Sequence, residues 1–216
     1  MAAQTQTTSE VSESPVQPST FERFAGVCAI LVSIGGILYA IAFVVLKSTL
    51  LSSLFLLLGG VLSTAVLTTV YNRLRKTDVA FSLWAFLLSG VGALGAAVHG
   101  GYELANGLHP VKVTGDLSNF LANSPNSIDP RGLLTFGLAG LGLFVIAWLI
   151  GRGKQFPRGL GYLGYLAAVL LIVLYLARLI LLTPTNPLIL GTAVLSGFIV
   201  NPLWYIWLGV TLLRGR

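Results

Sequence analysis

Six apolar segments, each long enough to cross a lipid bilayer, make up most of this chain. They cover residues 24–46, 50–71, 79–104, 132–150, 159–183 and 188–213. A bilayer core about 30 Å thick needs roughly 20 apolar residues in a helix. Because lipid cannot hydrogen-bond to the backbone, each segment is expected to be an α-helix. The sequence therefore predicts an all-α integral membrane bundle of six transmembrane helices.

The composition supports lipid as the solvent of this fold. Of 216 residues, 55% are hydrophobic and 9% are charged, whereas soluble proteins carry about 25% charged residues. We expect one bundle over residues 23–216, after a polar tail at 1–22 that is rich in Ser, Thr, Gln and Pro. Such a tail has too little apolar surface to fold alone, so we expect it to be disordered.

Basic residues in the connections predict the orientation. The cytoplasmic set would be Arg23, Arg73, Arg75, Lys76, Arg152, Lys154, Arg158, Arg214 and Arg216, and the outer set Lys47, Lys112 and Arg131. The positive-inside rule therefore places both termini in the cytoplasm. The net charge of +6 is then an orientation signal and does not indicate nucleic-acid binding.

Residues 105–131 form the one long connection, on the predicted outer side. This segment contains the turn-forming pairs Asn106-Gly107, His109-Pro110 and Asp129-Pro130. It is either a solvated loop or a lid over an outer-leaflet pocket, since long connections in compact domains are often functional.

Two patterns inside the segments predict helix packing and irregularity. Gly92, Ala96 and Gly100 recur every four residues, so they lie on one helix face and allow a neighbouring helix to approach. We expect this third span to be the most buried. Asn201-Pro202 lies within the sixth segment, where proline removes a backbone donor and predicts a kink. We expect Asn201 to hydrogen-bond to another helix.

Three strongly polar side chains interrupt the apolar segments at a similar predicted depth. His99 and Glu103 are four residues apart and share a helix face. Arg178 lies near the outer end of the fifth segment. Ionisable residues in membranes usually face the bundle interior or water. The sequence therefore predicts a Glu103–Arg178 ion pair with His99 beside it.

This trio has three interpretations. The first is a structural salt bridge between helices. The second is a ligand or ion site beneath the 105–131 loop, in which Arg178 holds an anionic headgroup or carboxylate. The third makes His99 an axial ligand of a haem or magnesium tetrapyrrole, with Gly95, Ala96 and Gly100 leaving room for the macrocycle.

Patterns of known catalytic sites are absent from the sequence. There is no HExxH, Walker A or GxSxG motif. No His/Cys cluster suggests a metal site, and Cys28 is the single cysteine. Asp78, Asp116 and Asp129 all fall in connections, which excludes an intramembrane aspartyl protease. These absences favour a non-catalytic protein.

The last third of the chain resembles a recurring pattern. It comprises residues 143–152, Phe-Pro-Arg-Gly-Leu-Gly-Tyr-Leu-Gly at 156–164, and Asn-Pro-Leu-Trp-Tyr-Ile-Trp-Leu-Gly at 201–209, closed by Arg214. The pattern is similar to that of uncharacterised bacterial multi-pass membrane proteins classed as domains of unknown function. The resemblance implies a helical bundle in a bacterial inner membrane and no particular reaction.

The leading hypothesis from the sequence is an accessory or scaffold subunit of a membrane protein assembly, with other membrane subunits and the lipid bilayer as partners. The alternative is binding or transport of a small anionic or lipid-like ligand at the outer leaflet through His99, Glu103 and Arg178. Binding of a pigment or haem through His99 is a further alternative.

Overall fold

The computed structural model describes residues 17–109, 129–181 and 186–215. Six helical spans in this part are long and apolar enough to cross a membrane: Thr20–Val45, Thr49–Leu74, Val79–Leu108, Pro130–Arg152, Arg158–Ile180 and Pro187–Leu213. The predicted number of six long, apolar helices is confirmed. The first span begins at Thr20, inside the tail predicted for 1–22, so that boundary was too late. The predictions for residues 1–16 of the tail and 110–128 of the loop lie outside the described residues.

The first three spans begin at clear capping signals. They are α1 (Thr20–Ala40) continued by the π-helical segment η1 (Ile41–Val45), then α2 (Thr49–Leu74) and α3 (Val79–Leu108). Ser19 and Glu22 form a capping box at the start of α1, and the Asp78 side chain accepts a hydrogen bond from the Phe81 amide. Helix α3 ends at Leu108, four residues beyond the predicted boundary.

The last three spans contain more irregular helix. The fourth consists of the 3₁₀ turn η2 (Pro130–Gly132), the π-helical η3 (Leu133–Leu138) and α5 (Ala139–Arg152); the fifth is α6 (Arg158–Ile180); the sixth consists of α7 (Pro187–Val194), the π-helical η4 (Leu195–Val200) and α8 (Asn201–Leu213). Segments η1, η3 and η4 thus place π-helical turns in three different spans. Such turns are rare in proteins, and many of those that occur lie at functional sites.

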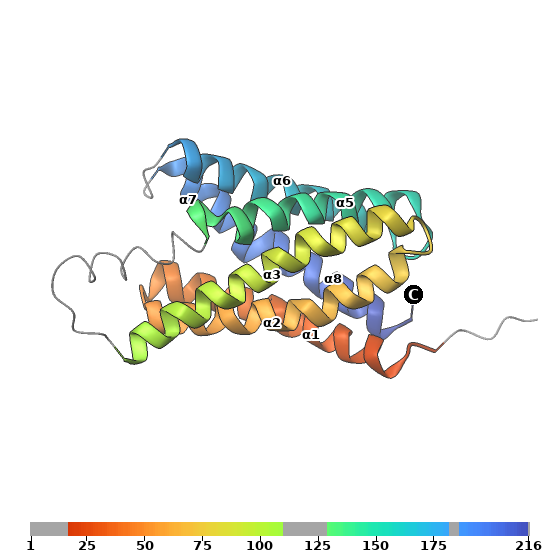
Figure 1. Ribbon diagram of the computed structural model, residues 1–216, viewed down its shortest axis with the longest axis horizontal. Coiled ribbons are helices and arrows are strands. Elements are labelled where there is room, and N and C mark those ends of the chain that lie inside the picture. Colours follow the sequence, from red (N-terminus) through yellow and green to blue (C-terminus); the bar gives the residue numbers. More distant parts are fainter. Residues whose placement is uncertain (1–16, 110–128, 182–185, 216) are drawn as a thin grey trace, which may run out of the picture.

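The spans pack in chain order around a ring, and Figure 1 shows them from the side, running along the long axis of the bundle. Each span packs on the next, and α8 packs back on α1. The start of α1 and the end of α8 lie at the same end of the bundle. We call this the basic end, since Arg73, Arg152, Arg158 and Arg214 lie there, and we call the opposite end the cavity end. Which end faces the cytoplasm stays a prediction.

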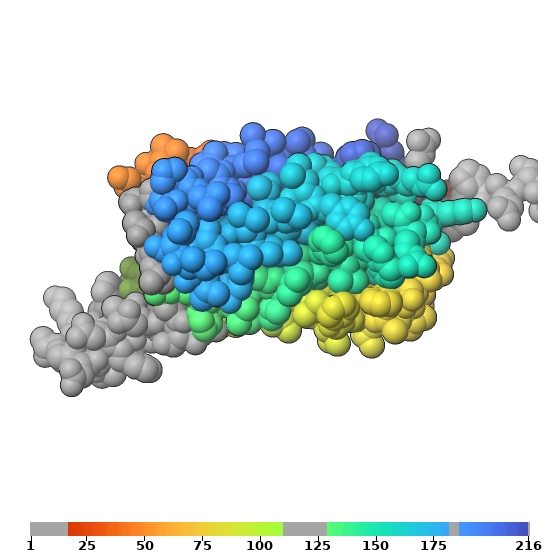
Figure 2. Space-filling model, turned by 90° about the horizontal axis from the view of Figure 1, so that it is seen from above, coloured from red at the N-terminus to blue at the C-terminus, as the bar shows by residue number. Residues whose placement is uncertain are grey.

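The outer surface of the ring is apolar. Helix α6, light blue in Figure 2, lies between α5 and the C-terminal span on one face of the bundle. Its residues Leu166, Val169 and Leu176 are 48%, 46% and 43% exposed. Exposed leucines and valines on every side are expected where the surroundings are lipid.

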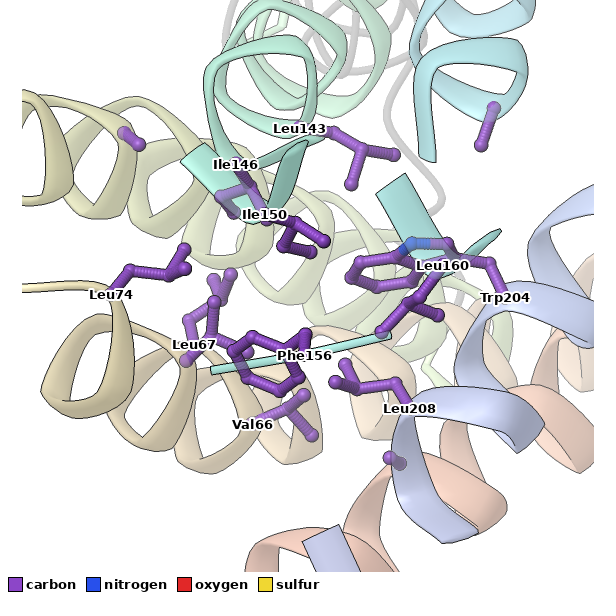
Figure 3. Packing of buried hydrophobic residues seen from close by; sticks show 14 of the residues in the cluster. Val66, Leu67, Leu74, Leu143, Ile146, Ile150, Phe156, Leu160, Trp204 and Leu208 are labelled. Carbon is purple, nitrogen blue, oxygen red and sulfur yellow. The ribbon is translucent and has the colours of Figure 1, made fainter. Parts of the chain in front are cut away.

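A packed apolar cluster closes the ring toward the basic end. Phe156, from the connection between α5 and α6, is 5% exposed and points in among Val66, Leu67 and Leu208 (Figure 3). The Arg73 guanidinium lies over the Phe156 ring, 5.4 Å from its centroid. Arg73 Nε also donates to Glu22 Oε1 at 2.9 Å. This arrangement ties α1, α2 and the α5–α6 connection together.

The small residues of α3 serve two interfaces. A Cβ on Gly100 would lie 2.6 Å from both Leu57 N and Ser53 O of α2, whereas one on Gly92 would lie 2.7 Å from Ala139 Cβ of α5. Close packing at Gly92 and Gly100 is as predicted, but the two glycines face α5 and α2 instead of one shared neighbour. The expectation that the third span is the most buried is wrong, because its most apolar stretch is 39% buried and that of the Pro130–Arg152 span is 44% buried.

The irregularity expected at Asn201-Pro202 is the π-helical segment η4, which ends just before them. Asn201 Nδ2 donates to Ser196 Oγ, 2.7 Å away and five residues earlier in the same span. The prediction that Asn201 hydrogen-bonds to another helix is therefore wrong, because its partner lies in the same span. The contact between helices at this level comes instead from Ser33 Oγ of α1, which donates to Pro202 O at 3.0 Å.

Candidate functional site

A cavity of about 450 Å³ occupies the middle of the ring and extends toward the cavity end. All six spans contribute to its wall, and its size is typical of small-molecule sites, roughly 300–1,000 Å³. The wall is predominantly apolar. Representative residues are Phe55, Leu56, Leu143, Leu174 and Ile189. Residues of η1, η3 and η4 all line this cavity, so the three π-helical segments share one location.

Two arginines supply positive charge to this apolar wall. Arg178, near the end of α6, is half-buried, and Arg131 of η2 is exposed; both line the cavity. The Arg178 guanidinium lies 5.3 Å from the centroid of the Phe136 ring, a cation–π arrangement. Among the described residues, Arg73 pairs with Glu22 and His99 contacts Glu103, and neither cavity arginine takes part in these contacts.

A tight turn positions Arg131. The buried Asp129 carboxylate accepts hydrogen bonds from Leu134 N at 2.7 Å and from Thr135 Oγ1 at 2.6 Å, which caps the start of the fourth span. Arg131 and Gly132 both have positive φ, 57° and 84°. Left-handed backbone at a non-glycine residue costs energy and is concentrated at functional sites.

The same turn supports Arg178 indirectly. Phe136 packs so closely against Gly132 that a Cβ at this glycine would collide with the aromatic ring. Because Gly132 also has positive φ, glycine is required here on two counts. The turn thus places Arg131 at the cavity and seats the ring beneath the Arg178 guanidinium.

Only part of the predicted polar trio comes together. His99 Nε2 lies 3.3 Å from Glu103 Oε1, and Ser53 Oγ donates to Glu103 Oε2 at 3.1 Å. The predicted Glu103–Arg178 ion pair is wrong, since the guanidinium lies over Phe136. Tyr39 of α1, which lines the cavity, lies within electrostatic range of both Glu103 and Arg178.

The surroundings of His99 do not fit a tetrapyrrole. A Cβ on Gly95 would lie 2.6 Å from Leu134 Cβ, and Gly100 faces the backbone of α2 at 2.6 Å. The space expected beside His99 is therefore filled by η3 and α2. The Nε2 atom of His99 is already against Glu103.

Polar groups deeper in the cavity are mostly satisfied within the protein. Ser33 donates to the Pro202 carbonyl, and Tyr205 lies within hydrogen-bonding reach of the Ser63 side chain. Two buried cavity-lining atoms, Ser89 Oγ and Trp204 Nε1, have no hydrogen-bond partner among the described residues. With most of its hydroxyls already paired, the deep cavity suits an apolar chain.

Sequence reasoning missed several of these residues. Arg131 was interpreted only as a loop cation that signals orientation, and Asp129 only as a turn former. An acidic residue directly before Pro130 and an apolar segment is a helix N-terminus signal, which could have indicated the cap. Tyr39 and Phe136 carry no signal in the sequence, because aromatic residues are common in membrane spans.

The described residues contain no group of three or more His, Cys, Asp or Glu placed to hold a metal ion. Comparison of the chain with protein-family models, with curated proteins and with solved structures found no match. The resemblance to uncharacterised bacterial membrane proteins therefore stays a prediction, and the functional argument depends on the cavity alone.

Proposed function

We propose that this protein binds an anionic amphiphile in the central cavity, with Arg178 and Arg131 holding the headgroup and the apolar wall holding the chain. One observation carries the proposal: two guanidinium groups, neither in an ion pair among the described residues, line one apolar cavity of about 450 Å³. The protein is non-catalytic in this proposal.

The cost of an arginine in a membrane supports this function. Charged side chains within membrane spans face water, a partner charge or a ligand, because hydrocarbon solvates a charge poorly. Guanidinium groups present a planar set of donors that matches carboxylate and phosphate oxygens. Two arginines at one cavity therefore favour a ligand with an anionic head.

The headgroup sets the selectivity in this proposal. An acyl chain leaves hydrocarbon when it enters the cavity, so the hydrophobic effect contributes little to the transfer. The apolar wall then determines which chains fit, and the arginines determine which headgroups bind. A neutral amphiphile with the same chain is therefore expected to compete poorly with the anionic ligand.

The positive-inside rule favours the outer leaflet as the location of the headgroup site, because it places the basic end in the cytoplasm. We place the protein in a bacterial inner membrane on the strength of the resemblance described above. The apolar cluster around Phe156 lies between the cavity and the basic end, which favours binding over passage of the ligand through the ring.

Binding of radiolabelled oleate to the purified protein in nanodiscs tests the headgroup site. We expect saturable binding that unlabelled oleate displaces and oleyl alcohol does not. Arg178→Gln and Arg131→Gln should each weaken binding by about 10- to 150-fold, the equivalent of one charged hydrogen bond of about 1.5–3 kcal/mol. Arg152→Gln is the control, since Arg152 lies over Trp148 at the basic end.

Adjacent glycines in α1 provide a matched test of the cavity. A Cβ on Gly35 or on Gly36 would meet nothing within 4 Å, but Gly36 lines the cavity and Gly35 is not among its lining residues. Gly36→Leu should therefore abolish oleate binding, while Gly35→Leu should retain it. Equal binding by both variants, or equal displacement by oleyl alcohol, would contradict the proposal.

A further inference from the structure

The exposed residues of the cavity wall lie mainly on η1 and α7. Five cavity-lining residues are also exposed: Phe43, Val44, Arg131, Leu190 and Val194. Four of them are apolar and belong to η1 and α7, at the cavity ends of the first and sixth spans. The side chains of Phe43 and Leu190 are 61% and 46% exposed.

The first and sixth spans diverge toward the cavity end. Near the basic end they touch, since a Cβ on Gly209 would lie 2.8 Å from Gly26 O. Farther along, a Cβ on Gly197 would lie 3.6 Å from Ala40 Cβ, an ordinary contact. Beyond this level η1 packs on α1 and α2, whereas α7 packs on α6 and η4.

Two other pairs of neighbouring spans, α2/α3 and α3/α5, are closed by backbone contact. Gly60 and Gly100 join α2 to α3, and a Cβ on Gly142 of α5 would lie 2.7 Å from Ser89 N of α3. The seam between η1 and α7 differs, because its two sides carry large apolar side chains. The Tyr39 and Phe43 rings stack there, with centroids 5.9 Å apart.

We propose that the seam between η1 and α7 is a lateral portal through which the ligand enters from the bilayer, so that the ligand is a membrane lipid rather than a water-soluble anion. This inference rests on the proposed function of the cavity. A chain passing between Phe43 and Val194 stays in contact with apolar side chains throughout. The headgroup of the ligand moves with the chain, stays at the level of the cavity end and approaches Arg178.

A membrane origin also explains the location of the charge. Bilayer lipids keep the headgroup at the surface and the chain in the hydrocarbon. The cavity repeats this order, with Arg131 at the cavity end and apolar residues such as Leu143 and Trp204 deeper. A lipid can therefore enter sideways without moving its charged head into hydrocarbon, which would be costly.

A bulky label placed on the folded protein tests the portal. The test variant is Val194→Cys and the control is Leu188→Cys. Val194 and Leu188 are both exposed residues of α7, at 41% and 51%, but of the two only Val194 lines the cavity. Each variant is reacted with a bulky maleimide after reconstitution. Cys28, at 1% exposure, is replaced by alanine in both. The measurements are the uptake rate of radiolabelled oleate from phosphatidylcholine vesicles and its equilibrium binding.

We expect the label at Val194→Cys to slow uptake by about tenfold or more, as a gating step would, and the label at Leu188→Cys to leave the rate unchanged. Unchanged uptake with the Val194→Cys label, while equilibrium binding persists, would overturn the portal and leave the proposed function standing. Absence of equilibrium binding in the unlabelled protein would overturn both.

Parallel titrations identify the lipid class. Oleate supplies a carboxylate on one chain, and dioleoyl phosphatidylglycerol supplies a phosphodiester on two chains. Both carry the anionic head and apolar tail that the cavity requires. Saturable binding of either lipid, with an uptake rate that the label at Val194→Cys lowers, supports the inference and identifies the lipid class. Saturable binding only of octanoate, a short-chain anion added from water, would overturn the membrane route.

Discussion

Replacing Gly100 by alanine tests the closest contact between α2 and α3. A Cβ at Gly100 would lie 2.6 Å from Leu57 N and from Ser53 O, whereas ordinary contact begins at 3.4 Å. Both obstructing atoms belong to helix backbone and cannot rotate away. Helices α2 and α3, which share the most extensive helix–helix interface in the described part of the chain, must therefore move apart.

The size of the effect follows from two opposing contributions. Overpacking of this kind costs about 1–3 kcal/mol, while exchanging glycine for alanine within a helix contributes up to about 1 kcal/mol of stability. Gly90, in the same helix, is the control, because a Cβ there would meet nothing within 4 Å. Gly100→Ala should therefore be less stable than Gly90→Ala by about 1–3 kcal/mol.

Unfolding by sodium dodecyl sulfate in mixed micelles, followed by far-ultraviolet circular dichroism, measures this difference. The loss should come with weaker packing along α2, since a small separation of the helices removes dispersion contacts along the whole interface. Equal stability of Gly100→Ala and Gly90→Ala would refute the close approach of the two helices.

Three further predictions address the site, the basic end and the oligomeric state. Gly132→Ala should weaken oleate binding, because left-handed backbone costs an alanine about 1–2 kcal/mol and its Cβ collides with Phe136; Gly151→Ala, which meets nothing, should bind normally. Arg73→Gln should lower the free energy of unfolding by about 1–3 kcal/mol, whereas Arg75→Gln, on an exposed position, should change it by less than about 0.5 kcal/mol. Native sizing after gentle detergent extraction tests the accessory-subunit hypothesis, which predicts a co-purifying protein; a clean monomer would count against it.

The number and boundaries of the spans could be predicted because lipid imposes one simple requirement on length and hydropathy. The predicted start of the third segment, Val79, agrees with the structure. The predicted end of that segment was four residues short, because the polar Asn106 and Gly107 marked a turn although the helix continues to Leu108. Local composition indicates where a span can end but does not fix the last turn.

The site could be predicted only in part, because contacts between spans depend on helix rotation. Arg178 was singled out as an intramembrane cation and lines the cavity, but its partner was assigned by depth alone. Depth did not show that Glu103 faces His99 and Ser53 while Arg178 faces Phe136. The π-helical segments, which change helix phase within three spans, make such rotations especially hard to infer from spacing.

Quenching of Trp204 by a brominated chain tests the central claim most directly. Trp204 lines the cavity and is 2% exposed, while Trp84 faces outward and is 51% exposed. Two variants, each retaining one of these tryptophans and carrying phenylalanine at the other three positions, are titrated with dibromostearate in nanodiscs. Trp204 should be quenched saturably, and Gly36→Leu should abolish that quenching, while Trp84 should be quenched in simple proportion to the amount added. Trp204 fluorescence that stays unchanged, or that follows the same curve as Trp84, would contradict occupancy of the cavity by an anionic lipid chain.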